Sequence, residues 1–135
     1  MTSSVEYKGD LRTTCVHLQS GQQIITDAPT DNQGKGEAFS PTDLLATSLG
    51  SCMLTIMGIT ANRHQINLVG TKINITKIMA DSPRRVSKIV AEVHFHSGIQ
   101  LDDKQRTLLE NSARACPVAK SLHAEIEQDI RFIYN

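Results

Sequence analysis

Aromatic residues are scarce in this chain, which has no tryptophan, three phenylalanines and two tyrosines among its 135 residues. Proteins that bind single-stranded nucleic acid usually stack bases on several aromatic rings, and this sequence offers no such platform. The charges also balance, with 14 basic and 14 acidic residues, so no net field draws the chain to nucleic acid or to an acidic membrane. We therefore expect neither nucleic acid nor a membrane among its partners.

The N-terminal sequence MTSSVEYKGD lacks the basic start and the apolar stretch of a signal peptide, so we expect a cytoplasmic protein. Residues 44–61 carry no charge, but they include too many small and polar residues, such as Ser48 and Thr55, for a bilayer helix. A buried core helix is the better interpretation. The length of the chain predicts one domain, over residues 1–135.

Cysteine motifs that bind metal are absent. Cys15, Cys52 and Cys116 form no C-x-x-C pair, so a zinc finger or a thioredoxin-type site is not expected. His94 and His96 share one face of a predicted strand, but two imidazoles without a third ligand do not predict a metal site. With no phosphate loop or cofactor motif present, we expect neither a metal nor a cofactor. In a reducing compartment, the thiols are left with packing or redox chemistry.

The first third of the sequence predicts three short strands, at residues 4–9, 12–19 and 22–27, separated by turn-forming Gly, Asp and Ser residues. A polar loop with Gly and Pro follows at residues 27–41, of the kind that often lines a site. A helix then begins near Pro41, with Ser40 or Thr42 as its cap.

Apolar residues occur on every side of this helix, so it must be covered all round. A small sheet covers only one side, and the helix is therefore expected between layers or against a partner subunit. The apolar residues concerned are Leu44, Leu45, Leu49, Cys52, Met53, Ile56, Met57 and Ile59.

The second half predicts a hairpin of strands at 67–80 and 87–98, because apolar and polar residues alternate along the second strand. A helix follows at 101–116, then a short helix from Pro117, and a final strand at 125–135. This order of elements predicts an α+β fold with antiparallel sheet.

Cys116 precedes Pro117 and lies at the start of the short helix, where the helix dipole can lower the pKa of a thiol. Cys52 lies in the middle of its helix and would need a cation from elsewhere, for which Arg12 is the obvious candidate. Both cysteines can equally be small apolar residues packed in a core, and Cys15 is best explained in that way. The residues alone leave packing and redox chemistry open.

Two stretches resemble the signatures of the OsmC/Ohr family of osmotically inducible and organic-hydroperoxide-resistance proteins. SPTDLLATSLGSCMLTI (40–56) resembles the pattern Pro-x-x-Leu-Leu-x-x-x-Leu-x-x-Cys, and ARACPVAKSL (113–122) resembles its Cys-Pro-Val signature. The resemblance implies an α+β homodimer in which two chains intertwine, with antiparallel sheets wrapped around central helices. It also implies thiol-dependent reduction of organic hydroperoxides, with an external dithiol as the reductant.

Carried over by position, the resemblance implies that Cys52 is the peroxidatic thiol, Cys116 the resolving thiol and Arg12 the group that stabilises the thiolate. The alkyl part of a peroxide would bind against apolar side chains. Those side chains are Phe39, Leu45, Leu49 and Met53.

Thr42 departs from the family pattern, in which a glutamate directly after the proline holds the arginine. Threonine cannot make that charged contact, and Asp43 is our candidate for the substitute acid, with Glu37 or another acid as alternatives. The departure indicates a divergent branch of the family. The alternative function is a dimeric binding or redox-sensing protein that has an apolar pocket and little peroxidase turnover.

Overall fold

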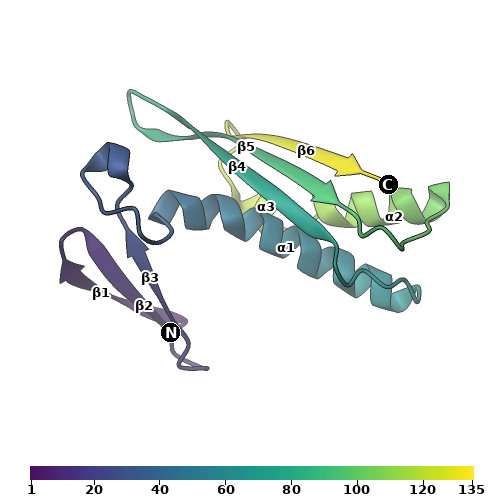
Figure 1. Cartoon of the computed structure of the whole chain (residues 1–135), viewed down its shortest axis with the longest axis horizontal. Coiled ribbons are helices and arrows are strands. Elements are labelled where there is room, and N and C mark those ends of the chain that lie inside the picture. Colours follow the sequence, from purple (N-terminus) through teal and green to yellow (C-terminus); the bar gives the residue numbers. More distant parts are fainter. The chain divides into compact units, whose positions relative to one another are not determined.

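The computed structural model describes residues 1–135 and divides them into two compact units, residues 1–45 and 46–135. Each unit contains its own three-stranded sheet, with the strand order β1-β2-β3 in the first and β4-β5-β6 in the second (Figure 1). Helices and sheets are thus combined in one chain, and the predicted α+β class is confirmed.

The first unit is an antiparallel meander of β1 (Ser3–Gly9), β2 (Arg12–His17) and β3 (Gln23–Asp27), followed by a turn of 3-10 helix at Thr30–Asn32. The three predicted strands are confirmed. None of the fully buried apolar residues of the protein lies in this unit, whose buried residues are polar: Thr26, Asp27 and Ser40. It therefore lacks the apolar core of an independent domain, and one domain over residues 1–135 stays a prediction.

Helix α1 (Pro41–Arg63) begins with a reciprocal cap between Ser40 and Asp43. The Asp43 backbone N–H donates to Ser40 Oγ at 3.0 Å, and the Ser40 backbone N–H donates to the Asp43 carboxylate at 3.0 Å. This arrangement satisfies two backbone donors that the helix leaves unpaired, so Ser40 is the cap residue of the two candidates.

One face of α1 is fully buried in the core of the second unit, and it comprises Ala46, Leu49, Gly50, Met53, Met57 and Ala61. Other apolar positions are left open, with Leu45 40% exposed and Ile59 45% exposed. The helix is long and apolar enough to cross a membrane, but its buried face and its polar residues fit a core helix. The chain itself therefore covers only part of the apolar surface of α1.

The second sheet contains the predicted hairpin, formed by β4 (Lys72–Ala80) and β5 (Arg85–His94) in antiparallel pairing. Its third strand, β6 (Glu127–Ile133), pairs with β5 in parallel. This strand differs from the antiparallel sheet that we expected, while the other strand pairs are antiparallel. Because α2 (Asp103–Arg114) and α3 (Pro117–Ser121) cross over between β5 and β6, the chain returns to the sheet in the same direction (Figure 1).

The core of the second unit lies between the buried face of α1, the sheet and α2. Ile89, Ala91 and Val93 of β5 are fully buried, as the alternation predicted, together with Leu109 and Ala113 of α2. Asp102 is the N-cap of α2. Its side chain accepts a hydrogen bond from the Gln105 backbone N–H, and the Gln105 side chain accepts one from the Asp102 backbone N–H, which forms a capping box.

Gly50 marks a close approach of α1 to β4. A Cβ atom at this position would lie 3.1 Å from two side-chain carbons of Ile75 and 3.5 Å from Ile73. The absence of a side chain therefore sets the helix-to-sheet spacing two residues before Cys52. A Cβ atom at Gly58, in the same helix, would have no heavy atom within 4 Å, so this glycine serves as a control.

We expect Gly50→Val to lower the free energy of unfolding by about 1–3 kcal/mol, because the added methyl groups overpack the contact with Ile75. Gly58→Val should change it by less than about 0.5 kcal/mol, since valine replaces glycine in open space. Urea unfolding followed by circular dichroism measures both. Equal effects at the two glycines would contradict the close approach at Gly50.

Candidate active site

Cys52 of α1 and Cys116 at the start of α3 come together in the second unit, although they are 64 positions apart (116 minus 52). Cys52 packs against the core cluster that contains Cys116 and lies near enough to raise the pKa of the Cys116 thiol, and both thiols are free. Cys52 is partly exposed, whereas Cys116 is 0% exposed and belongs to the core cluster. Cys52 is therefore the more accessible of the two residues.

A hydrogen bond between α1 and α2 helps to place Cys52 near Cys116. Thr60 Oγ1 and Ser112 Oγ are hydrogen-bonded at 2.7 Å, which ties α1 to α2. Thr60 lies about two turns after Cys52, and Ser112 lies about one turn before Cys116. Since Pro117 then starts a new helix, the backbone bends at Cys116 and its side chain lies against α1.

The environment of Cys116 combines opposing effects on its pKa. The Ala119 backbone N–H donates to Cys116 Sγ at 3.4 Å, which lowers the pKa of the thiol. Burial and the Cys52 thiol both raise that pKa, and burial is the largest effect, so the net shift is upward. The start of the helix does lower the pKa of Cys116 through the backbone N–H groups of Ala119 and Val118, but removal from water outweighs both donors. The expectation of a lowered pKa is therefore wrong.

Arg12 of β2 is held by Asp27 of β3 in the first unit. Its Nε donates to one carboxylate oxygen at 2.7 Å and its Nη2 to the other at 2.8 Å, and Nη2 also donates to Glu37 at 3.2 Å. Asp27 is 1% exposed. The hydrogen bond from Arg12 lowers the pKa of Asp27, and the same pairing raises the pKa of Arg12, so both groups stay charged.

Asp27 is the partner that the sequence analysis missed. We expected Asp43 to hold Arg12, but the acids that bind the guanidinium are Asp27 and Glu37, and Asp43 caps α1. The signal that could have found it was the pairing of the second and third predicted strands, because β2 and β3 set Arg12 directly opposite Asp27. Residues opposite each other in adjacent strands have side chains on the same face.

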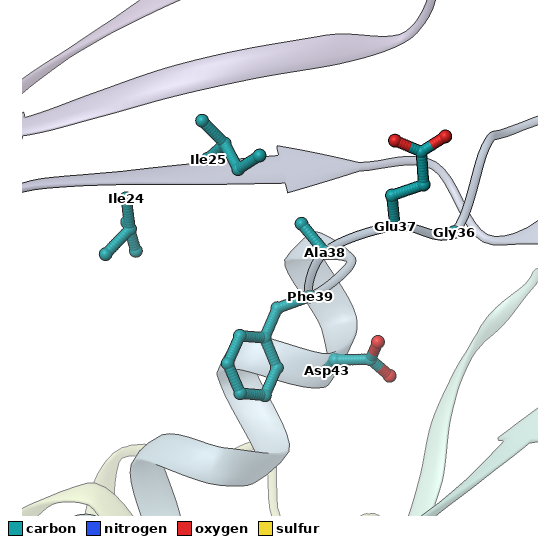
Figure 2. A pocket seen from close by; sticks show the side chains of 7 residues that line it. All are labelled: Ile24, Ile25, Gly36, Glu37, Ala38, Phe39 and Asp43. Carbon is teal, nitrogen blue, oxygen red and sulfur yellow. The ribbon is translucent and has the colours of Figure 1, made fainter.

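A pocket of about 530 Å³ lies in the first unit beside β3 and the start of α1. Ile24 and Phe39 line its apolar part, and the carboxylates of Glu37 and Asp43 point in different directions around it (Figure 2). Gly36, Ala38 and Ile25 complete the lining. Phe39, which we expected at a substrate site, is 52% exposed and open to a ligand.

The other expected apolar wall residues are placed differently. Leu45 is exposed on the first turns of α1, as a binding surface requires. Leu49 and Met53 are 0% exposed and pack within the core of the second unit. Both lie on the face of α1 that fills the core, so neither lines an open pocket of this chain as we expected.

Cys15 lies on β2 and is partly buried. Its neighbours across the sheet are Val5 and Ile24, and its sulfur lies 3.8 Å from Thr13 Oγ1. This environment contains no second thiol, and packing remains the simplest interpretation of Cys15.

Comparisons with known proteins agree on a single family. Residues 34–131 match the family described as OsmC-like protein. A crystal structure from Psychrobacter arcticus 273-4, provisionally described as an osmotic stress induced and detoxification response protein, is 56% identical. It superimposes with a TM-score of 0.94 over 98% of this chain and 96% of that chain. No protein with a curated description matches the chain.

More distant structures share the fold. An organic hydroperoxide resistance protein OsmC from Legionella pneumophila is 14% identical, with a TM-score of 0.76 over 99% of this chain and 98% of that chain. A provisionally described organic hydroperoxide resistance protein from Vibrio cholerae, with captopril in one of its active sites, is 16% identical. Its TM-score is 0.73 over 98% of this chain and 91% of that chain.

The Arg12–Asp27 pair makes stability depend on pH. The pKa of Asp27 is lowered in the folded protein. Ionised Asp27 therefore adds to the free energy of unfolding above its unfolded-state pKa of about 4, and this contribution is lost as the pH falls through its folded-state pKa. Asp27→Asn should therefore be less stable than wild type at pH 7, and the difference should narrow below about pH 4. Urea unfolding at several pH values measures this.

Asp10→Asn is the matched control, because Asp10 is an exposed acid of the same unit. This variant should follow the wild-type stability at every pH. If the free energies of unfolding of Asp27→Asn and wild type differ by a constant amount down to about pH 2, the charge of Asp27 is not what stabilises the unit.

Proposed function

Because the chain belongs to the OsmC-like protein family, we propose that it reduces organic hydroperoxides with Cys52 and Cys116 as a two-cysteine pair. The observation that carries the proposal is the proximity of these two thiols, which lie on different helices and far apart in the sequence. Packing alone does not require two free thiols to adjoin, with one partly exposed and the other sealed.

In the first step, the thiolate of Cys52 attacks the terminal oxygen of the hydroperoxide. The O–O bond breaks, the alkoxide leaves and takes a proton to become an alcohol, and Cys52 becomes a sulfenic acid. The partial exposure of Cys52 supports this role, because a peroxide has to reach the sulfur.

In the second step, Cys116 attacks the sulfenic sulfur and forms a disulfide with release of water. The buried position of Cys116 supports the role of resolving thiol, because it protects this sulfur from direct oxidation while keeping it next to Cys52. An external dithiol then opens the disulfide by thiol–disulfide exchange and restores both thiols.

The proposal assigns to Arg12 the stabilisation of the Cys52 thiolate. Its support is that Asp27 fixes the guanidinium in a bidentate ion pair, which keeps the charge in one orientation. Phe39 and Leu45 would bind the alkyl part of the peroxide, and their exposed apolar surfaces support this assignment.

We further propose a homodimer. The support is the apolar surface that this chain leaves open on α1, at Leu45 and Ile59, and on the first sheet, at Val5, Tyr7 and Ile24. A first unit without an apolar core needs such cover to be stable. A cytoplasmic location stays a prediction.

Cys52→Ser should lower the rate of cumene hydroperoxide reduction, with dithiothreitol as the donor, by at least about a hundredfold, because the nucleophile is lost. Cys116→Ser should still consume about one equivalent of peroxide. Without dithiothreitol, its Cys52 should then remain as sulfenic acid, which mass spectrometry detects as the dimedone adduct. Cys15→Ser is the matched control and should keep the wild-type rate.

Equal and negligible rates in wild type and Cys52→Ser would remove the enzyme function, and retained binding of a fatty acid would then favour the alternative binding protein. Arg12→Gln should slow the oxidation of Cys52 by peroxide. An unchanged rate constant for that step would exclude Arg12 from the site.

The dimer is tested by sedimentation velocity, in which wild type should have twice the chain mass of 14.8 kDa. Ile59→Asp should weaken the association by at least about tenfold, because it places a charge on the open apolar surface. Asn62→Asp adds the same charge at an exposed position of α1 and should leave the dimer intact. A monomeric wild type at tens of micromolar would contradict the proposal.

A further inference from the structure

Gln128 is a polar residue on the inner side of β6. It pairs in register with Ile89, which is fully buried, and Ile126 and Ile130, two positions away on either side, pack against the core. An amide on such a face costs free energy unless it is hydrogen-bonded. Gln128 Nε2 donates to the backbone carbonyl of Ala119 in α3 at 2.9 Å. This bond joins the last strand to the short helix that begins at Cys116.

Ala119 links Gln128 to the thiol. Its carbonyl accepts from Gln128, and its N–H donates to Cys116 Sγ at 3.4 Å. Helix α3 has only five residues, too few to be stable without outside contacts. The hydrogen bond from Gln128 is therefore a contact that fixes the position of the Ala119 N–H against the sulfur.

We propose that Gln128 is a positioning residue for the resolving cysteine: through Ala119 it holds α3 so that Cys116 faces Cys52 and its thiolate receives an N–H donor. This inference rests on the proposed function, because it concerns the second step of that reaction. Gln128 itself touches neither sulfur through a hydrogen bond and acts through the backbone of α3.

The step concerned is the closure of the disulfide. The Cys116 thiolate attacks Cys52 Sγ, the S–S bond forms, the S–O bond breaks and hydroxide leaves to become water with the proton released by Cys116. Cys116 is oxidised and the sulfenic sulfur is reduced, so no further reactant is needed. Because burial raises the pKa of Cys116, the thiolate depends for stabilisation on backbone N–H groups, of which that of Ala119 has the larger effect and that of Val118 the smaller.

Gln128→Met tests the inference, because it keeps the length of the side chain and removes the donor. Gln100→Met makes the same change at an exposed position and is the matched control. Reduced protein is mixed with cumene hydroperoxide, quenched at set times with dimedone and N-ethylmaleimide, and analysed by mass spectrometry. This separates the oxidation of Cys52 from the closure of the disulfide.

We expect Gln128→Met to slow closure by about fivefold, the effect of one hydrogen bond, with the rate of Cys52 oxidation unchanged. The midpoint of the pH profile for closure should move upward, because the thiolate loses a well-placed donor. The control should match wild type in both rates. Wild-type closure with an unchanged pH profile in Gln128→Met would overturn the inference, and so would an equal slowing of both steps, which indicates a general loss of structure.

Diamide separates this inference from the proposed function. The Cys52 thiolate adds to the N=N bond of diamide, and Cys116 then displaces the hydrazine product and forms the same disulfide. If peroxide fails to oxidise wild type but diamide closes the disulfide, the proposed function is wrong. The rate of diamide-driven closure in Gln128→Met then still tests whether Gln128 positions Cys116. If neither oxidant gives a Cys52–Cys116 disulfide, both are wrong. Should Gln128→Met fail to fold, Gln128→Glu, which has the same shape without the N–H donor, replaces it with the same expected outcomes.

Discussion

The packing of α1 against the second sheet is the contact on which the arrangement of the thiols depends. Leu49, Met53 and Met57 fill the core along one face, and Gly50 lets the helix approach Ile75 closely. With that face fixed, the rotation of the helix about its axis is fixed as well, and Cys52 lies at the border between the core and the open side. A helix packed by bulkier residues would stand farther from the sheet and carry its cysteine away from α3.

The two cysteines differ in how deeply they are buried. Cys116 is sealed within the core, where its pKa is raised, and Cys52 remains partly open. A low dielectric environment protects the second thiol from oxidants but also opposes its ionisation. The backbone N–H of Ala119, itself held by Gln128, offsets part of that cost. In the reaction that we propose, the buried thiol therefore depends on this fixed backbone.

The first unit is held together by polar interactions rather than by an apolar core. Its buried groups are Thr26, Asp27 and Ser40, and Asp27 is tied to Arg12 by two short hydrogen bonds. Apolar side chains such as Tyr7 and Ile24 remain exposed on its sheet. Such a unit holds the Arg12 guanidinium in one orientation but leaves apolar surface exposed. A second copy of the chain would cover that surface, which is the physical basis of the proposed dimer.

Local patterns in the sequence determined the strands, the hairpin at β4 and β5, the start of α1 and the α+β class, since each depends on side-chain alternation or on hydrogen bonds between near neighbours. Tertiary structure decided the parallel pairing of β6, the choice of Asp27 as the partner of Arg12 and the burial of Leu49. These outcomes depend on strand register and helix rotation, which are set by contacts between segments distant in the chain. The pKa of Cys116 belongs to the second group, because a helix start is visible in the sequence whereas the depth at which the fold buries it is not.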